Sequence, residues 1–329
     1  MLQSLPVAPC RPNKCINCLE AEPDSEEHIF AEGAGGSLSA YILCRDCNEK
    51  FGKNIDSPYL KQPTIELARN AYRIRGKRNI IPQPLSGPYL VPGPIGQSTI
   101  KLDIDFKPRI IPQIEDVLVL NDDAIQTTMV IDAADREKIP RIVRSKLERF
   151  FNSEKGIALG WSEEEKKRAI DSVVEKYMSA PDVETPVGQL KNSFVSDFGT
   201  MFFELAKVAF EIAAIEDGDD FIHSEAAAKM RGLLNRVEIG RINSFEKFQD
   251  LLNAFHAVPL PHNSQVFLGI QAITGGKAFE HHIALLIGRH IIVSMFGDVY
   301  LFADLRLNES AGAIYMNDAV NGKVTYLKI

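Results

Sequence analysis

The sequence predicts an α+β protein in which a small cysteine-rich β-hairpin and helix precede a larger mixed domain. Three observations support this prediction. All five cysteines lie before residue 50, and a proline-rich stretch at residues 81–98 separates them from the rest of the chain. Residues 99–329 then alternate between strand-like and helix-like hydrophobic patterns. A length of 329 residues suits two domains of ordinary size.

Composition excludes several classes of protein. Hydrophobic residues make up 45% of the chain and charged residues 25%, which is typical of a folded globular protein. The first residues lack a basic segment followed by a long apolar run, so we expect no secretory signal and a cytoplasmic location. The most apolar stretch, residues 201–215, contains charged side chains and is too short to cross a bilayer, so we expect no membrane partner.

Four of the cysteines form two Cys-x-x-Cys pairs, Cys15 with Cys18 and Cys44 with Cys47. A two-residue spacer lets both sulfur atoms of a pair face one point, so the pairs can hold one structural zinc ion. Two disulfides or a redox pair are the alternatives, but a cytosolic setting disfavours the first and the doubled pattern disfavours the second. Cys10 lies outside the pattern and is interpreted as a spare thiol.

The segment between the pairs predicts a β-hairpin followed by a helix. Residues 28–30 suit a short strand, residues 31–36 a glycine-rich loop, and residues 41–43 a returning strand. A helix is expected from Arg45 to Lys53. A zinc clamp at the base of this unit would bring the end of the first strand against the first turn of the helix.

Three side chains at that junction suit the hydrolysis of a phosphodiester. A neutral imidazole such as that of His28 can take a proton from water at physiological pH, because its unperturbed pKa is about 6.5. Glu27 and Asn48 offer oxygen atoms, which are hard donors suited to Mg²⁺ or Mn²⁺. Such a cation neutralises charge on the scissile phosphate. A lone His beside a Glu is otherwise usually a surface pair.

This segment resembles the zinc-containing branch of the HNH (His-Me finger) endonuclease family, with Cys-x-x-Cys, Glu-His, Gly-Gly and Cys-x-x-Cys-Asn in order. The resemblance covers roughly the first quarter of the chain and implies a ββα-metal module with treble-clef-like zinc. It implies His28 as the catalytic base and Glu27 and Asn48 as ligands of a catalytic Mg²⁺ or Mn²⁺. It implies the four paired cysteines as zinc ligands, and DNA as the partner, with RNA left open.

The sequence departs from the family's usual pattern in two places. Glu27 stands where an aspartate is more usual, and its longer side chain shifts the expected metal position. Residues 37–43 contain no asparagine, whereas the family's middle asparagine steadies the loop over the base. Ser37, Ser39 or a backbone carbonyl would have to orient His28 instead.

Basic residues concentrate near the predicted module, although the whole chain has a net charge of −7. A local basic patch can hold phosphates because screening confines its field to roughly 8–10 Å. A helix is expected over residues 64–75, with Thr64 as its cap, Gly76 as its stop, and Arg69 and Arg73 on one face. The alternative is an ordinary solvated face. The candidate phosphate contacts are Lys50, Lys53, Arg69, Arg73, Arg75, Lys77 and Arg78.

We expect three regions: the nuclease module at residues 1–80, a Pro/Gly-rich linker at 81–98, and an α+β domain at 99–329. In the last region we predict helices at 139–152, 162–178, 194–215 and 224–235. Strands are predicted at 99–106, 117–120, 127–131, 266–272, 282–286, 290–296 and 299–305, with a final hairpin turning at Asn321 and Gly322.

The sequence of residues 99–329 does not indicate a particular biochemical role. They contain no glycine-rich phosphate loop, catalytic triad or second metal motif. His281, His282 and His290 are interpreted as structural rather than as a metal cluster. We expect this region to recognise the target or to restrain the nuclease, through a regulatory ligand or a homo-oligomer. The alternative for the whole chain is a non-catalytic treble-clef zinc finger that binds nucleic acid or regulates.

Overall fold

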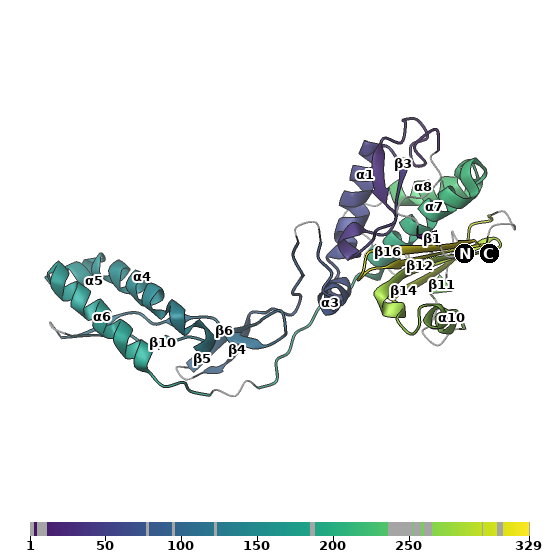
Figure 1. Cartoon of the computed structure of the whole chain (residues 1–329). Helices are drawn as coiled ribbons and strands as arrows, with labels where there is room; N and C mark the ends of the chain where they lie inside the picture. The colour runs from purple at the N-terminus through teal and green to yellow at the C-terminus, as the bar shows by residue number, and fades with distance from the viewer. Residues whose placement is uncertain are drawn as a thin grey trace. The chain divides into compact units, whose positions relative to one another are not determined.

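The computed structural model describes residues 3–4, 12–76, 79–93, 96–121, 124–184, 188–235, 252, 258–259, 265–297, 299–307 and 312–328. Cys10, Lys77 and Arg78 therefore lie outside the described residues. The chain forms two compact units, one of Met1–Pro82 with Phe194–Ile329 and one of Gln83–Ser193 (Figure 1). The predicted α+β class, with an N-terminal ββα module, is confirmed.

The first unit begins with the predicted hairpin and helix. Strands β2 (Ser25–His28) and β3 (Ser39–Leu43) pair antiparallel, with the short helix η1 (Glu32–Ala34) in the loop between them. Helix α1 (Arg45–Phe51) starts directly after Cys44 and runs into a π-helical turn, η2 (Gly52–Asp56). Helices α2 (Ser57–Leu60) and α3 (Pro63–Ala71) follow.

Helix α3 differs from its predicted form at both ends. Pro63 occupies the first turn after Gln62, which is the N-cap, so Thr64 is not the cap. The helix ends at Ala71, and Arg73 has a φ of 56°, in the left-handed region. The expectation that Arg69 and Arg73 share one helix face is therefore wrong, because a left-handed residue turns the chain out of the helix.

The C-terminal part of this unit contains a seven-stranded antiparallel sheet with the strand order β1-β16-β15-β12-β13-β14-β11. The register of neighbouring strands pairs, for example, His282 with Asn317. The predicted turn between the last two strands is present at residues 319–322. The strands are β1 (Gln3–Ser4), β11 (Val258–Pro259), β12 (His281–Ile287), β13 (His290–Met295), β14 (Val299–Asp304), β15 (Ala313–Asp318) and β16 (Lys323–Lys328).

Helix α7 (Phe198–Ile222) joins the ββα module to this sheet. It contacts β12, β13 and β14, and it also contacts η2 and α2 of the module. Every side chain from Met201 to Ile215 is buried, as expected for a helix covered on all sides. Helix α8 (Glu225–Asn235) packs against α7.

The larger of two hydrophobic clusters in this unit joins the module to the sheet, and a smaller one packs Ile270 against the sheet. The larger cluster extends from Phe30 and Phe51 of the module, through Val208 and Phe210 of α7, to Tyr315 of the sheet. From the sequence we predict one domain at residues 99–329. In the structure, residues 194–329 instead belong to the same compact unit as residues 1–82 and complete its core. The ββα module is too small to bury its own apolar face, and α7 covers that face.

The second unit has its own core. Helices α4 (Ile139–Phe151) and α6 (Glu163–Ser179) pack together around Val143, Leu147 and Ile170, with Trp161 against them. Strands β4 (Tyr89–Gly93) and β5 (Gly96–Leu102) form a hairpin partly inside the stretch that was expected to be a linker. The other elements are β6 (Pro108–Ile110), β7 (Gln113–Ile114), β8 (Leu118–Asn121), β9 (Ala124–Gln126), β10 (Met129–Val130), η3 (Ala133–Lys138) and α5 (Glu154–Ile157).

One predicted strand is a helix. Residues 266–272 lie in α10 (Gln265–Ile273), which is followed by the short helix η4 (Ala278–Glu280). Ile270 is buried whereas Leu268 is 61% exposed, a pattern that an unbroken apolar run does not reveal in the sequence. Within the described part of the chain, no helix is both long and apolar enough to cross a membrane.

The separate cores predict separate unfolding. Phe210 is fully buried in the core of the first unit, so Phe210→Ala should cost that unit about 3–5 kcal/mol. In a urea titration, the reactivity of the cysteine thiols reports the first unit, and the fluorescence of Trp161, the one tryptophan, reports the second. We expect the variant to lower the thiol midpoint alone. Equal shifts of both midpoints would contradict two independent cores.

Candidate active site and metal centre

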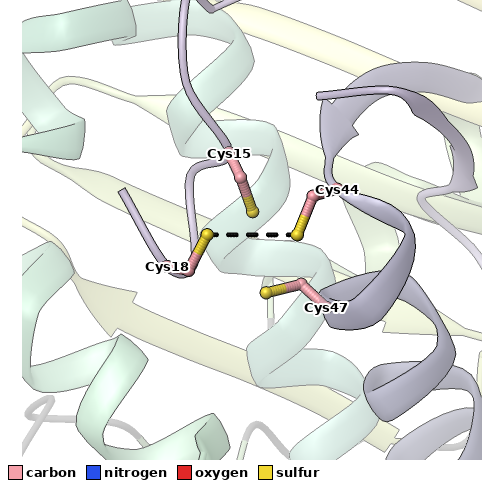
Figure 2. A group of neighbouring side chains, drawn as sticks. All are labelled: Cys15, Cys18, Cys44 and Cys47. Atoms are coloured by element: carbon pink, nitrogen blue, oxygen red, sulfur yellow. Dashed lines mark hydrogen bonds between the residues drawn. The ribbon is translucent and has the colours of Figure 1, made fainter. Parts of the chain in front are cut away.

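The two cysteine pairs meet at one point. The sulfur atoms of Cys15, Cys18, Cys44 and Cys47 all lie within 4.8 Å of one another and turn toward a common centre (Figure 2). All four are free cysteines, so the disulfide alternative does not hold. The Sγ atoms of Cys18 and Cys44 are 3.9 Å apart, close to the edge of about 3.8 Å of a zinc tetrahedron with Zn–S bonds of about 2.3 Å. The cluster therefore fits a structural zinc ion.

The local backbone positions these thiols. The first pair lies on a turn in which the Cys15 amide donates to Ala21 O at 2.8 Å. In the second pair, Cys44 is the N-cap of α1 and Cys47 lies in its first turn. Burial raises the pKa of the Cys15 and Cys47 thiols, so their ionisation depends on a cation bound among them. The Asn17 amide donates to Cys47 Sγ at 3.3 Å.

Glu27, His28 and Asn48 line one pocket of 880 Å³ beside the cysteine cluster. Glu27 and His28 end strand β2, and Asn48 lies on α1, one residue after Cys47. The Asn48 amide nitrogen donates to Ser25 Oγ at 3.0 Å and to Glu26 O at 2.9 Å. These bonds tie α1 to β2 and leave Oδ1 as the atom of the amide that suits a cation.

The ring of His28 is half-buried on the wall of this pocket. The serines considered for orienting it have other partners: Ser39 Oγ donates to Glu26 Oε1 at 2.7 Å, and Ser37 bonds to Asn317. His28 is held instead through its backbone, since it pairs with Ser39 in the hairpin and its carbonyl accepts a bond from Lys207 Nζ at 3.3 Å.

Glu27 is nearly inaccessible and forms an ion pair. Its Oε1 lies 2.7 Å from Nζ of Lys207, which also lies 2.8 Å from Oδ1 of Asp56. Although burial alone lowers the pKa of Lys207, the carboxylates of Asp56 and Glu27 raise it well above its usual value. The ammonium therefore stays charged. Burial raises the pKa of Glu204 and Glu211, one turn away on either side, well above its usual value, which favours the neutral form of these two carboxyls.

The sequence analysis missed Lys207 and Asp56. The available signal was the presence of charged residues inside the apolar run 201–215, which was used only to exclude a membrane span. Fully buried lysines are rare unless they are paired, so a lysine inside this apolar run indicates a buried acidic partner.

The loop between β2 and β3 is held by the C-terminal sheet. Asn317 of β15 accepts from Ser37 N at 2.7 Å and donates to Gly35 O at 2.9 Å. Gly35 has a φ of +89°, and a Cβ on Gly36 would lie 1.8 Å from Phe30 O, so both positions require glycine. Asn317 thus steadies the loop that contains no asparagine of its own.

His282 supports the same loop from β12. Its Nε2 donates to Ala34 O at 2.8 Å, and its ring packs on Phe30 and Phe296. His281 Nδ1 bonds to the Lys277 carbonyl, and His290 stacks on Phe302. Among groups of three or more His, Cys, Asp or Glu in the described residues, the cysteine cluster is the one whose ligand atoms lie close enough to share an ion.

Arg69 is the predicted phosphate contact that lines the pocket. The residue is 9% exposed, and its Nε has no hydrogen-bond partner among the described residues. Arg45 and Lys61, which the sequence analysis did not select, also line the pocket. Lys50, Lys53, Arg73 and Arg75 are exposed and lie outside the pocket lining. Of these, Lys50 donates to Asn235 and Arg75 to Asn79.

Acidic groups dominate the wall of the pocket. Three Lys or Arg side chains line it, against six carboxylates: Glu26, Glu27, Glu32, Glu49, Asp56 and Glu66. Such a wall attracts divalent cations and repels a bare phosphodiester. The pocket therefore suits a polyanionic ligand only when a cation is bound with it.

Residues 15–64 match the HNH endonuclease family. The matched segment includes both cysteine pairs, Glu27, His28, Asn48 and Asp56, whereas Lys207, His282 and Asn317 lie outside it. No curated protein and no solved structure matches the chain. The match therefore includes the cysteine cluster and most of the pocket wall, but not Arg69 or the elements that support the pocket.

The buried ring of His282 predicts a pH-dependent stability. Burial lowers the pKa of His282 to about 4, whereas the unfolded ring titrates near 6.5. The unfolded chain therefore binds a proton that the folded chain does not, and stability is lost as the pH falls from about 6.5 toward 4. The linkage amounts to about 2 kcal/mol between pH 7 and pH 5.

Urea unfolding of the wild type and of His282→Gln at both pH values measures this effect. The glutamine amide can still donate to Ala34 O but does not titrate. We expect the drop in unfolding free energy to be about 2 kcal/mol smaller in the variant. An equal drop in both proteins would show that His282 does not contribute.

Proposed function

Because residues 15–64 form an HNH endonuclease domain, we propose that this chain is a divalent-metal-dependent DNA endonuclease that hydrolyses phosphodiester bonds. The observation that carries the proposal is the meeting of Glu27, His28 and Asn48 on one pocket wall beside the four-cysteine cluster. An imidazole, a carboxylate and an amide oxygen are the groups that a metal-assisted hydrolysis requires.

In this proposal His28 is the general base. Its imidazole accepts a proton from a water molecule, and the hydroxide attacks the phosphorus atom as the bond to the leaving oxygen breaks. The ring is half-buried, so substrate and water reach it from the pocket while the backbone pairing with Ser39 fixes its position. Lys207 reinforces that position through the His28 carbonyl.

Glu27 and Asn48 would hold the catalytic Mg²⁺ or Mn²⁺. A carboxylate and an amide oxygen fit these cations, which favour hard oxygen ligands and keep several waters. The Asn48 amide is already oriented, since its nitrogen donates to β2. When bound, the cation neutralises charge on the scissile phosphate and the leaving oxygen.

Basic groups would hold the flanking phosphates. Arg69, Arg45 and Lys61 lie on the pocket wall, and we assign them to the strand being cut. The exposed Lys50, Lys53, Arg73 and Arg75, with Lys77 and Arg78 outside the described residues, would contact the backbone further away. Because the pocket is acidic overall, we expect DNA binding to require the divalent cation.

We propose a separate role for residues 83–193. This compact unit lies outside the core that holds the nuclease pocket, so it is the candidate for target recognition or for restraint of the nuclease. A regulatory ligand or a homo-oligomer would act through it or through residues 194–329.

Nicking of a supercoiled plasmid tests the proposed function. The zinc-loaded protein should nick DNA with Mg²⁺ or Mn²⁺ and not without it. His28→Ala should lose about 10²–10⁴-fold in rate, because it removes the general base. Its zinc content and melting temperature should stay unchanged, since a half-exposed ring is lost from a pocket wall. His223→Ala, an exposed histidine at the end of α7, is the matched control and should cut normally.

Nicking by His28→Ala at the wild-type rate would contradict the assignment of the base. Metal-independent retention of nucleic acid without any cutting would favour the alternative of a non-catalytic treble-clef zinc finger. A labelled RNA of the same sequence, tested in parallel, separates DNA from RNA as the substrate.

A further inference from the structure

Lys207 lies at the centre of a buried charge cluster directly beneath the pocket. The lysine side chain is completely inaccessible, and its Nζ contacts Glu27 Oε1 at 2.7 Å and Asp56 Oδ1 at 2.8 Å. The same Nζ lies 3.3 Å from the His28 carbonyl oxygen. One ammonium thus bonds to three residues from β2 and η2, and all three line the pocket.

Fold stability does not explain this arrangement. Removing charges from water costs several kcal/mol per ion, and apolar groups of similar size in place of a buried ion pair often leave stability unchanged or raise it. Apart from Glu204 and Glu211, the other residues of helix α7 between Met201 and Ile215 are apolar, so an apolar residue at position 207 would suit the core. We therefore attribute the buried ammonium to a requirement of the pocket above it rather than to the stability of the fold.

We propose that Lys207 is a positioning residue of the nuclease site, which fixes the Glu27 carboxylate and the end of β2 so that Glu27 can receive the divalent cation. This inference rests on the proposed function. Carboxylates that bind metals are commonly held by a second hydrogen bond, which sets the direction of their remaining lone pairs. A lysine on a long packed helix is a rigid anchor for that purpose.

Asp56 completes the arrangement from the opposite side. It holds the same ammonium from the π-helical turn η2, so Lys207 is tethered between two carboxylates and cannot swing away from Glu27. Without the ammonium, two carboxylates would face each other in a buried space and repel. The ion triad of Glu27, Asp56 and Lys207 carries one net negative charge, which suits a neighbouring cation.

The placement also links distant parts of the chain. Lys207 lies 180 residues after Glu27 and outside the segment that matches the endonuclease family. Helix α7 therefore supports the pocket from behind its lining, and the family segment depends on Lys207 for the geometry of its metal ligand.

Mn²⁺ binding to the full-length, zinc-loaded protein without DNA tests this inference. The loss of the free Mn²⁺ signal in electron paramagnetic resonance gives the dissociation constant independently of cutting. Lys207→Met should raise that constant by about 10–100-fold, the usual effect of losing a group that orients a metal ligand. Lys207→Arg, which retains charge and hydrogen bonds, should restore most of the affinity.

Two further variants separate positioning from folding and from charge. Glu211→Gln, at the same depth on α7, is the matched control and should bind Mn²⁺ like the wild type. Lys207→Met combined with Asp56→Asn keeps one net negative charge in the triad, so it should fold more readily than Lys207→Met alone. It should still bind Mn²⁺ more weakly, because Glu27 has lost its anchor.

The inference is overturned if folded, zinc-replete Lys207→Met or the double variant binds Mn²⁺ with the wild-type constant. It is also overturned if Lys207→Arg binds as weakly as Lys207→Met. A wild-type protein that neither binds Mn²⁺ nor nicks DNA would remove the proposed function itself. A wild type that does both, with variants that do the same, would remove only the role of Lys207.

Discussion

The convergence of four thiols on one point is the constraint on which the site depends. The matched segment is short, and its hairpin and helix alone offer little apolar surface to bury. The cysteine cluster lies where the start of α1 meets the base of the hairpin, and a zinc ion bound by it would fix the two together. Asn48 then follows Cys47 directly and bonds to β2, which places it on the same pocket as Glu27 and His28.

Residues far along the chain also support the ββα module and its pocket. Helix α7 covers the apolar face of the module and contributes Lys207, while β12 and β15 hold the hairpin loop through His282 and Asn317. The charged groups of the pocket are thus held by two supports, the four-cysteine cluster and the packed helix and sheet. The pocket and its supports therefore come from segments far apart in the sequence.

Local features of this fold could be predicted from the sequence, and long-range ones could not. The cysteine spacing gave the metal centre, and alternating patterns gave most strands of the sheet, because both depend on near neighbours. The contact between Lys207 and Glu27 spans 180 residues and leaves no periodic trace. The hydrogen bonds of Asn317 to the hairpin loop join equally distant residues and could not be predicted for the same reason. The helix at 265–273 was mistaken for a strand because a short apolar run has no clear period.

Anomalous diffraction from crystals grown with zinc and soaked in Mn²⁺ is the most direct test of the account. Data at the two absorption edges locate each metal separately. We expect zinc among the four cysteine sulfurs, and manganese between an oxygen of Glu27 and Oδ1 of Asn48, with the ring of His28 facing it across the pocket. Manganese bound elsewhere, or none in this pocket, would contradict the assignment of the chain as a metal-dependent nuclease.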